Sequence, residues 1–228
     1  MKNSFKLLLL SLFISMSMNG QFKFGAQIGL NGSSVNETIS NDYENFAFPA
    51  KTKLGINLGL SVFYTLNEEI SLQSGLFYSN KGYNVDMEEL QKKFDTGTIT
   101  GKWHYDYNYL ELPINFTYHF NDFEIYTGPY LAYALSGKAL VDITIKDGST
   151  TETYKETETL VPVTGSVKPE DARSNSDATI FKAFNAFDTG INIGAGYQYN
   201  QFLIRAQYAI GFTNITPKIS DTPDFNRD

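Results

Sequence analysis

The chain has 228 residues, a formal net charge of −7 and no cysteine. Disulfides, thiolate metal sites and cysteine nucleophiles are therefore excluded. The acidic charge argues against binding to nucleic acid, whose phosphates attract basic proteins. Aromatic residues make up 15% of the chain and glycine occurs 18 times, a composition that favours strands over helices. We therefore expect an all-β protein.

The N-terminus has the pattern of a secretory signal peptide. Lys2 and Lys6 precede an apolar run at 7–14, and small and polar residues follow it. The run is too short for a transmembrane helix, which needs about 20 apolar residues. We expect residues 1–20 to be a cleaved signal peptide and residues 21–228 to form one exported domain. No later segment has the composition of a transmembrane helix, so a place in a membrane requires a β-barrel.

From residue 21 onward, apolar and polar residues alternate with the period of two that is typical of strands. In the run 187–199, for example, one face is apolar and the other carries glycine, asparagine and aspartate. The alternation predicts seven strands, at 22–30, 54–64, 70–79, 110–119, 123–137, 187–199 and 202–212.

The polar face of these strands distinguishes a membrane barrel from a soluble one. It holds glycines and small residues with few charges, whereas a solvated face is rich in Lys and Glu. The narrow interior of an eight-stranded barrel suits such small residues. Aromatic residues near strand ends match the girdles of outer-membrane barrels. We therefore expect a transmembrane up-and-down antiparallel β-barrel; a soluble, secreted lipid-binding barrel is the alternative.

The expected connections alternate between short and long. Short turns are expected at 65–68, 121–122 and 200–201, and long loops at 31–50, 81–102 and 139–185. In outer-membrane barrels the short turns are periplasmic and the long loops are external. Asp147-Gly148 lies between two alternating runs and predicts a hairpin within the last loop, which extends barrel strands above the membrane.

Single-chain bacterial barrels have an even number of strands, so eight are expected and seven are visible. After Phe212 the chain has the polar composition of a loop. Either one strand lacks a visible pattern or the recorded sequence ends one strand early. We favour the second explanation, because an open barrel would leave backbone groups unpaired in lipid.

Several segments resemble the PorT-like outer-membrane β-barrel family, also described as porin-family proteins. The resemblance covers residues 21–228, and its carriers are the segments 24–31, 109–114, 126–130, 194–197, 205–208 and 211–215. Tyr-Leu-Glu-Leu-Pro at 109–113 and Gly128-Pro129 are the most specific of these. The resemblance implies an outer-membrane location in a Gram-negative cell and no catalytic activity. Some family members assist protein secretion.

Four charged residues fall on the expected interior face: Glu111, Glu124, Asp188 and Arg205. We interpret them as a structural network of the lumen, because charges removed from water need partners. We expect Arg205 to pair with Glu111 or Glu124. An acid/base site or a pore constriction is the alternative interpretation.

No residues stand out as a catalytic, cofactor or metal site. His104 and His119 are fifteen residues apart near one strand, roughly 50 Å at about 3.3 Å per residue, so they cannot share an ion. The aromatic row Trp103, Tyr105, Tyr107 and Tyr109 is expected at the outer rim. It is either a contact surface for carbohydrate or peptide, or a continuation of the aromatic girdle above the membrane.

The sequence therefore predicts a monomeric, non-enzymatic outer-membrane barrel with a structural, binding or secretion-accessory role. Outer-membrane lipid surrounds it, and its long loops are expected to contact envelope proteins or external ligands. A small-solute porin is the alternative function for the same fold.

Overall fold

The computed structural model describes residues 21–36, 38–40, 45–47, 49–94, 97–168 and 182–218. The expected signal peptide at 1–20 and the C-terminal residues 219–228 lie outside these residues, as does part of the expected loop 139–185. Among the described helices, none is both long and apolar enough to cross a membrane.

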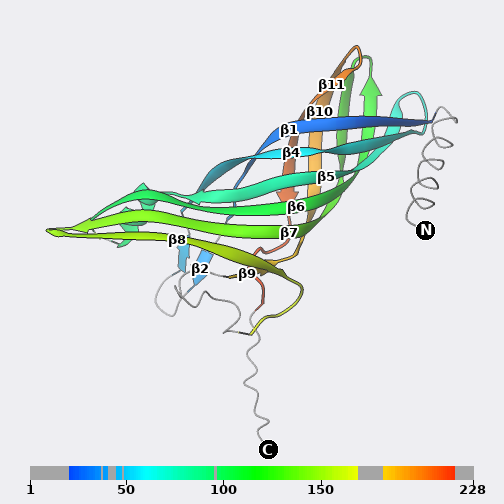
Figure 1. Cartoon of the computed structure of the whole chain (residues 1–228). Coiled ribbons are helices and arrows are strands. Elements are labelled where there is room, and N and C mark those ends of the chain that lie inside the picture. The colour runs from blue at the N-terminus through cyan, green and yellow to red at the C-terminus, as the bar shows by residue number, and fades with distance from the viewer. Residues whose placement is uncertain are drawn as a thin grey trace, which may run out of the picture.

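Seven strands form one curled antiparallel sheet (Figure 1). In sheet order they are β1 (Phe22–Ser33), β4 (Ala50–Thr65), β5 (Ile70–Val85), β6 (Thr98–Phe120), β7 (Phe123–Asp147), β10 (Phe187–Tyr199) and β11 (Phe202–Gly211). These are the seven predicted strands, each next to its neighbour in the chain, so the predicted all-β, up-and-down arrangement is confirmed. Within the described chain, β1 pairs only with β4, and β11 only with β10.

Smaller elements lie at the end of the sheet opposite the short turns (Figure 1). β8 (Thr150–Val163) pairs with β7, and β9 (Ala183–Asn185) pairs in parallel with β8. The helix α2 (Met87–Phe94) connects β5 to β6. β2 (Thr38–Ser40) and β3 (Asn45–Ala47) form a separate two-stranded sheet.

The short turns are tight, as predicted. Asn121 and Asn200 each adopt a φ of 53°, the left-handed conformation that two-residue hairpin turns require and that asparagine tolerates. Gly148 has a φ of 56° in the predicted Asp-Gly hairpin, which joins β7 to β8. That hairpin is confirmed.

The predictions of long loops at 81–102 and 139–185 are largely wrong. β5 continues to Val85 and β6 begins at Thr98, so residues 81–102 are mainly strand and helix. β7 continues to Asp147, far beyond the expected end at 137. The reason is that alternating aromatic and β-branched residues continue through these segments, where their packing outweighs the polar composition.

The side chains are distributed in the opposite way to those of a soluble barrel. The buried polar residues are Ser61, Ser71, Gln73, Ser79, Glu111, Asn115, Thr117, Glu124 and Asn192. Large apolar side chains are exposed instead, and on β1 Ile28 and Leu30 are 86% and 83% exposed. On β6 the exposed apolar face runs from Leu112 to Phe120, close to the 9–11 residues of a transmembrane strand. This pattern favours a membrane barrel over the soluble alternative.

Aromatic residues gather at the end of the sheet that carries the short turns. The rings of Phe120 and Phe123 lie 5.8 Å apart, and the rings of Phe123 and Tyr197 lie 4.9 Å apart. On β1 and β4, the rings of Phe22 and Tyr64 are 4.8 Å apart. This arrangement fits the aromatic girdle expected at a membrane interface.

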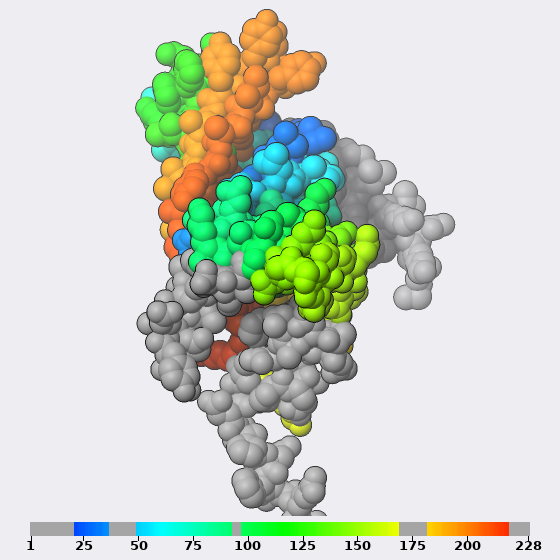
Figure 2. Space-filling model, turned by 90° about the vertical axis from the view of Figure 1, so that its left-hand side faces the viewer, coloured from blue at the N-terminus to red at the C-terminus, as the bar shows by residue number. Residues whose placement is uncertain are grey.

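We call the exposed apolar face of the seven strands, which on β6 runs from Leu112 to Phe120, the apolar belt. β6 and β7 extend beyond it and form with β8 an external sheet, which we define as residues 98–108, 137–147 and 150–160. Figure 1 shows it reaching past the outer ends of β10 and β11. Seen from its tip in Figure 2, the β7–β8 hairpin stands out from the rest of the molecule (yellow-green). The inward face of the external sheet packs against β5, α2 and β9. Together they form a buried apolar cluster of Tyr83, Val85, Leu90, Tyr105, Tyr107, Ala139, Val141, Ile143, Leu160 and Phe184.

A β-bulge on β7 lies where the belt meets the external sheet. Tyr109 pairs with Ala134, and Asn108 pairs with Ser136, so Leu135 is the extra residue. Below the bulge, odd-numbered residues of β7 such as Leu131 are exposed. Above it, odd-numbered residues such as Val141 are buried. The bulge therefore exchanges the two faces of β7.

Asp86 caps the N-terminus of α2. Its carboxylate accepts hydrogen bonds from the backbone N–H groups of Glu88 and Glu89, at 3.1 and 3.4 Å, and pairs with Lys51 at 2.8 Å. The hydrogen bond from Lys51 and these backbone contacts lower the pKa of Asp86 below its ordinary value of 3.8. The stability that the ionised carboxylate contributes is therefore fully present above that value and is lost as the pH falls through the lowered pKa.

Replacing Asp86 with alanine should loosen the start of α2 by about 1 kcal/mol, the usual cost of a lost N-cap. Hydrogen exchange of the backbone amides at 88–92 should be faster in Asp86→Ala and nearly unchanged in Asp86→Asn, which keeps the acceptor. Equal exchange in Asp86→Ala and the wild type would show that the cap does not hold the helix.

Candidate functional site

The concave face of the sheet lines an open cavity of about 1980 Å³. Side chains from β1, β4, β5, β6, β7, β10 and β11 line it. Period-two alternation places them there, because every second residue of each strand points to this face. The cavity holds two separate groups of charged residues, and each group is centred on one cation.

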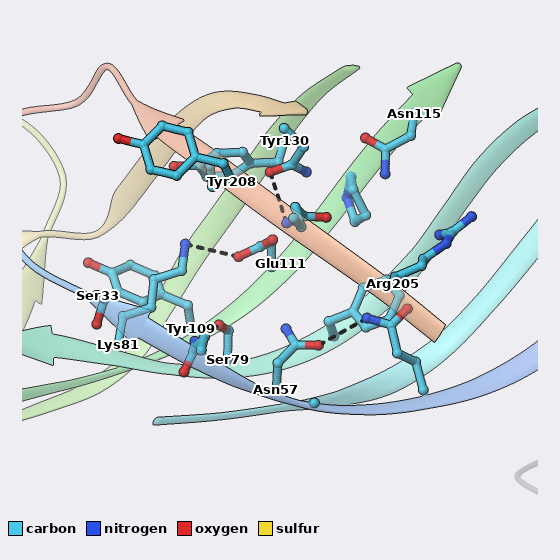
Figure 3. Close-up of a pocket in the computed structure, with 18 of the residues that line it drawn as sticks. Ser33, Asn57, Ser79, Lys81, Tyr109, Glu111, Asn115, Tyr130, Arg205 and Tyr208 are labelled. Atoms are coloured by element: carbon cyan, nitrogen blue, oxygen red, sulfur yellow. Dashed lines mark hydrogen bonds and ion pairs between the residues drawn. The ribbon is translucent and has the colours of Figure 1, made fainter. Parts of the chain in front are cut away.

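The first group is centred on Lys81 of β5. Its ammonium Nζ lies 2.9 Å from Glu111 Oε2 and 3.1 Å from Asp188 Oδ2. Figure 3 shows Lys81 directed at Glu111 between the rings of Tyr109 and Tyr130, which lie 5.5 and 4.7 Å from Nζ. Tyr130 also donates to Asp188 at 3.3 Å. One lysine thus holds two carboxylates from strands that lie far apart in the sequence.

The second group is centred on Arg205 of β11. Its Nε donates to Glu124 Oε1 of β7 at 2.5 Å, and its Nη1 donates to Gln73 of β5. The guanidinium carbon lies 4.5 Å from the ring centre of Tyr126. The pairing of Arg205 with Glu124 is one of the two predicted alternatives. Glu111 pairs instead with Lys81.

Glycines on β10 make room for these groups. A Cβ atom at Gly190 would lie 2.6 Å from the ring of Tyr130, and one at Gly196 would lie 2.7 Å from Glu124 Oε1. At Gly194 a Cβ atom would collide with the ring of Tyr126. The small residues that the sequence places on the polar face are therefore complementary to large side chains of β7.

Four buried polar atoms near these groups have no hydrogen-bond partner within the described residues. They are Asn115 Oδ1, Thr117 Oγ1, Asn192 Nδ2 and Arg205 Nη2. Buried polar groups of this kind usually bind ordered water. The interior is therefore a polar lumen with ion pairs across it.

The structure brings the four predicted lumen residues into two groups and adds Lys81, which the sequence interpretation missed. Residue 81 was assigned to a loop, although it has the same parity as Phe77 and Ser79 on the interior face of β5. Continuing the alternation past residue 79 would have identified it.

The aromatic row lies in a different place from the predicted outer-rim surface. Tyr105, Tyr107 and Tyr109 are buried on the inward face of β6, and Trp103 packs against the same cluster. The rings of Tyr105 and Tyr83 stack at 4.7 Å, and Tyr107 contacts Phe184 at 4.8 Å. Because β5, β7 and β9 cover these side chains, they form the core of the external sheet instead of an exposed contact surface.

The two histidines have separate surroundings. His104 lies 3.3 Å from Asp106, while His119 contacts Ser71 at 2.8 Å and lies 3.6 Å from Glu124. Within the described ranges, no group of three or more His, Asp or Glu residues is arranged to hold a metal ion.

A row of hydrogen-bonded polar residues crosses the outer face of four strands directly above the apolar belt. Lys53 Nζ donates to Asn80 at 3.0 Å, Asn80 donates to Asn108 at 2.8 Å, and Asn108 donates to Ser136 at 3.0 Å. Lys53 also pairs with Asp106 at 2.6 Å. Sequence reasoning missed this row, because its four members come from four strands. We call Lys53, Asn80, Asn108 and Ser136 the boundary row.

Comparison with known proteins agrees with this geometry. The family described as outer membrane protein beta-barrel domain matches residues 15–216. No curated protein and no solved structure gave a significant match. The match covers most of the chain and includes all seven strands of the curled sheet. The chain therefore belongs to the outer membrane protein beta-barrel domain family.

Proposed function

We propose that this protein is a non-enzymatic outer-membrane barrel whose task is to hold the external sheet at the cell surface. The observation that carries this proposal is the continuity of β6 and β7. Each runs without a break from the apolar belt into a sheet that has its own apolar core. A sheet built in this way is fixed rigidly to the barrel and is suited to a structural, binding or secretion-accessory role.

The interior supports a barrel that conducts few or no ions. Lys81 links β5 to β6 and β10, and Arg205 links β11 to β5 and β7. An eight-stranded barrel is just wide enough for its interior to be filled by side chains. Bulky ion-paired groups at two levels would then obstruct the passage of solutes, which argues against the porin alternative.

Within the family, we propose that the chain is PorT-like. Its two most specific segments lie side by side, because Glu111 pairs in register with Ala132 and Pro113 with Tyr130. A Cβ atom at Gly128 would collide with the backbone carbonyl of Ile114, so close packing of β6 on β7 requires glycine there. The carboxylate of Glu111 also forms an ion pair with Lys81. These motif residues thus have defined structural roles.

The remaining parts of the proposal concern export and partners. We propose that residues 1–20 direct export to the outer membrane of a Gram-negative cell and are then removed. The mature chain would be a monomer surrounded by outer-membrane lipid. Envelope proteins or external ligands would contact the external sheet and the loops beside it.

The proposal is tested on native protein extracted from isolated outer membranes. We expect a shift in gel mobility between unheated and boiled samples, because a closed barrel resists detergent until it is heated. In planar bilayers we expect little or no single-channel conductance. Stable, open channels would instead support the porin. Protein recovered in the aqueous phase without a mobility shift would support the secreted lipid-binding barrel.

A further inference from the structure

The outward face of the external sheet carries lysine and threonine in a regular array. Register pairing and exposure assign these residues to one face: Thr98, Thr100, Lys102, His104 and Asp106 of β6; Lys138, Leu140, Asp142, Thr144 and Lys146 of β7; Thr151, Thr153, Lys155, Thr157 and Thr159 of β8. Contacts across the face agree, since Lys155 pairs with Asp142 at 3.0 Å and the hydroxyl oxygens of Thr144 and Thr153 are 3.2 Å apart.

This face is basic, although the whole chain has a net charge of −7. It has four lysines and two aspartates. Both aspartates are already paired, Asp106 with Lys53 and Asp142 with Lys155. Within the described part of the chain, the three exposed lysines Lys102, Lys138 and Lys146 have no acidic partner. They are available to an anion from outside the chain.

The opposite face of the same sheet is acidic at its edge. On β8 the residues between the outward threonines are Glu152, Tyr154, Glu156, Glu158 and Leu160, whose register partners on β7 include the buried Val141 and Ile143. Basic residues therefore point away from the mouth of the barrel and acidic residues point toward it. A sheet polarised in this way has a preferred side for an anionic surface.

The basic face is continuous with the lipid-facing surface of the barrel. It begins at the boundary row, and Lys138 is two residues beyond Ser136, about 7 Å along the strand at about 3.3 Å per residue. Lys102 is six residues beyond Asn108, roughly 20 Å by the same rise. Lys138 therefore lies within the headgroup layer, which adds about 5–8 Å to each side of the hydrocarbon core. Lys102, and Lys146 ten residues beyond Ser136, lie above that layer.

We propose that the outward face of the external sheet binds the phosphate groups of outer-leaflet glycolipid headgroups. Lys138 contacts phosphates at the depth of the headgroups, and Lys102 and Lys146 contact phosphates on sugars that extend above them, each as a point charge. The threonine hydroxyls between them donate hydrogen bonds to phosphate and sugar oxygens. Each lysine near an anionic surface strengthens binding about fivefold at low salt. This inference rests on the proposed membrane location and adds a ligand class to the external sheet.

The test uses the full chain inserted into nanodiscs of two compositions. One contains phosphatidylcholine alone, and the other also contains a glycolipid with an extended, phosphorylated oligosaccharide headgroup. Hydrogen exchange is measured for the backbone amides at 98–108 and 137–160. We expect severalfold slower exchange with the phosphorylated lipid, and we expect the difference to disappear in about 1 M salt, where the Debye length is about 3 Å.

Matched variants assign the effect to this face. The triple variant Lys102→Gln, Lys138→Gln, Lys146→Gln should lose the protection. The triple variant Lys23→Gln, Lys92→Gln, Lys218→Gln removes the same charge from exposed lysines elsewhere and should keep it. Equal loss in both triples would overturn the inference, as would equal exchange in the two nanodiscs. Protection by inorganic phosphate in neutral nanodiscs would overturn the lipid assignment.

Failure of the proposed function gives a different result. If the chain did not insert, the amides of the apolar belt would exchange rapidly in both nanodiscs. If the chain inserted and only the external sheet lacked protection, the proposed outer-membrane barrel would be supported and the glycolipid site would be excluded.

Discussion

Replacing Arg205 with alanine should destabilise the folded barrel by about 3–5 kcal/mol, the usual cost of removing one partner from a buried ion pair. The loss leaves Glu124, whose side chain is only 5% exposed, without its cation. It also removes the hydrogen bond to Gln73, which joins β11 to β5. We expect a lower midpoint of urea unfolding, measured by heat-modifiable gel mobility. We also expect a lower yield of refolding into phospholipid vesicles.

Two variants separate this effect from a general loss of charge. The double variant Arg205→Met, Glu124→Gln removes both charges and should recover most of the stability. Lys155→Ala also breaks an ion pair, with Asp142 at 3.0 Å, but the Lys155 side chain is 79% exposed, so the loss should cost about 1 kcal/mol or less. If Arg205→Ala left both unfolding and refolding yield unchanged, the Arg205 group would have no structural role.

Replacing Lys81 with methionine should have an effect at least as large. The apolar stem is retained, but Glu111 and Asp188 lose their shared cation and repel each other in the lumen. Contacts of Nζ with the rings of Tyr109 and Tyr130 are lost as well. Because Lys81 spans from β5 to β10, we expect lower stability and more channel activity in planar bilayers.

The rescue variant is Lys81→Met, Glu111→Gln, Asp188→Asn, which removes all three charges. It should restore stability toward the wild type while conductance stays higher, because the neutral side chains no longer clamp the two sides of the lumen together. Wild-type conductance in Lys81→Met would mean that the lysine does not obstruct the lumen. Wild-type stability in the same variant would mean that the two carboxylates have other means of neutralisation.

The fold was largely predictable because alternation reports directly which residues of a strand face lipid. The seven strands, the tight turns at Asn121 and Asn200, and the Asp147-Gly148 hairpin all follow from local chemistry. The extent of β5, β6 and β7 was missed, although the alternation continues through their outer halves. One face of those halves has the polar composition of a solvated surface, and this composition was interpreted as that of a loop. The helix α2 is short and polar, and packing of Leu90 into the external core holds it.

The interior site was predictable in composition but only partly in its pairing. The period-two alternation within each strand assigned Glu111, Glu124, Asp188 and Arg205 to the interior face. This assignment does not require knowledge of how the strands pair. Which cation meets which carboxylate depends on the register between strands and on the curl of the sheet. That dependence explains why Lys81, and not Arg205, holds Glu111. The burial of Tyr105 and Tyr107 depends likewise on β7 and β9.

The bulge at Leu135 has a consequence for how deeply the protein sits in its membrane. Along β7 most aliphatic residues have odd numbers, but those before Leu135 face lipid and those after it face a protein core. On β6 the change from a protein core to lipid occurs without a bulge. The apolar residues have odd numbers and face inward up to Tyr109, and they have even numbers and face outward from Leu110. The two changes lie in register. Immersion of the chain is thus specified to about one residue, or roughly 3.3 Å of strand.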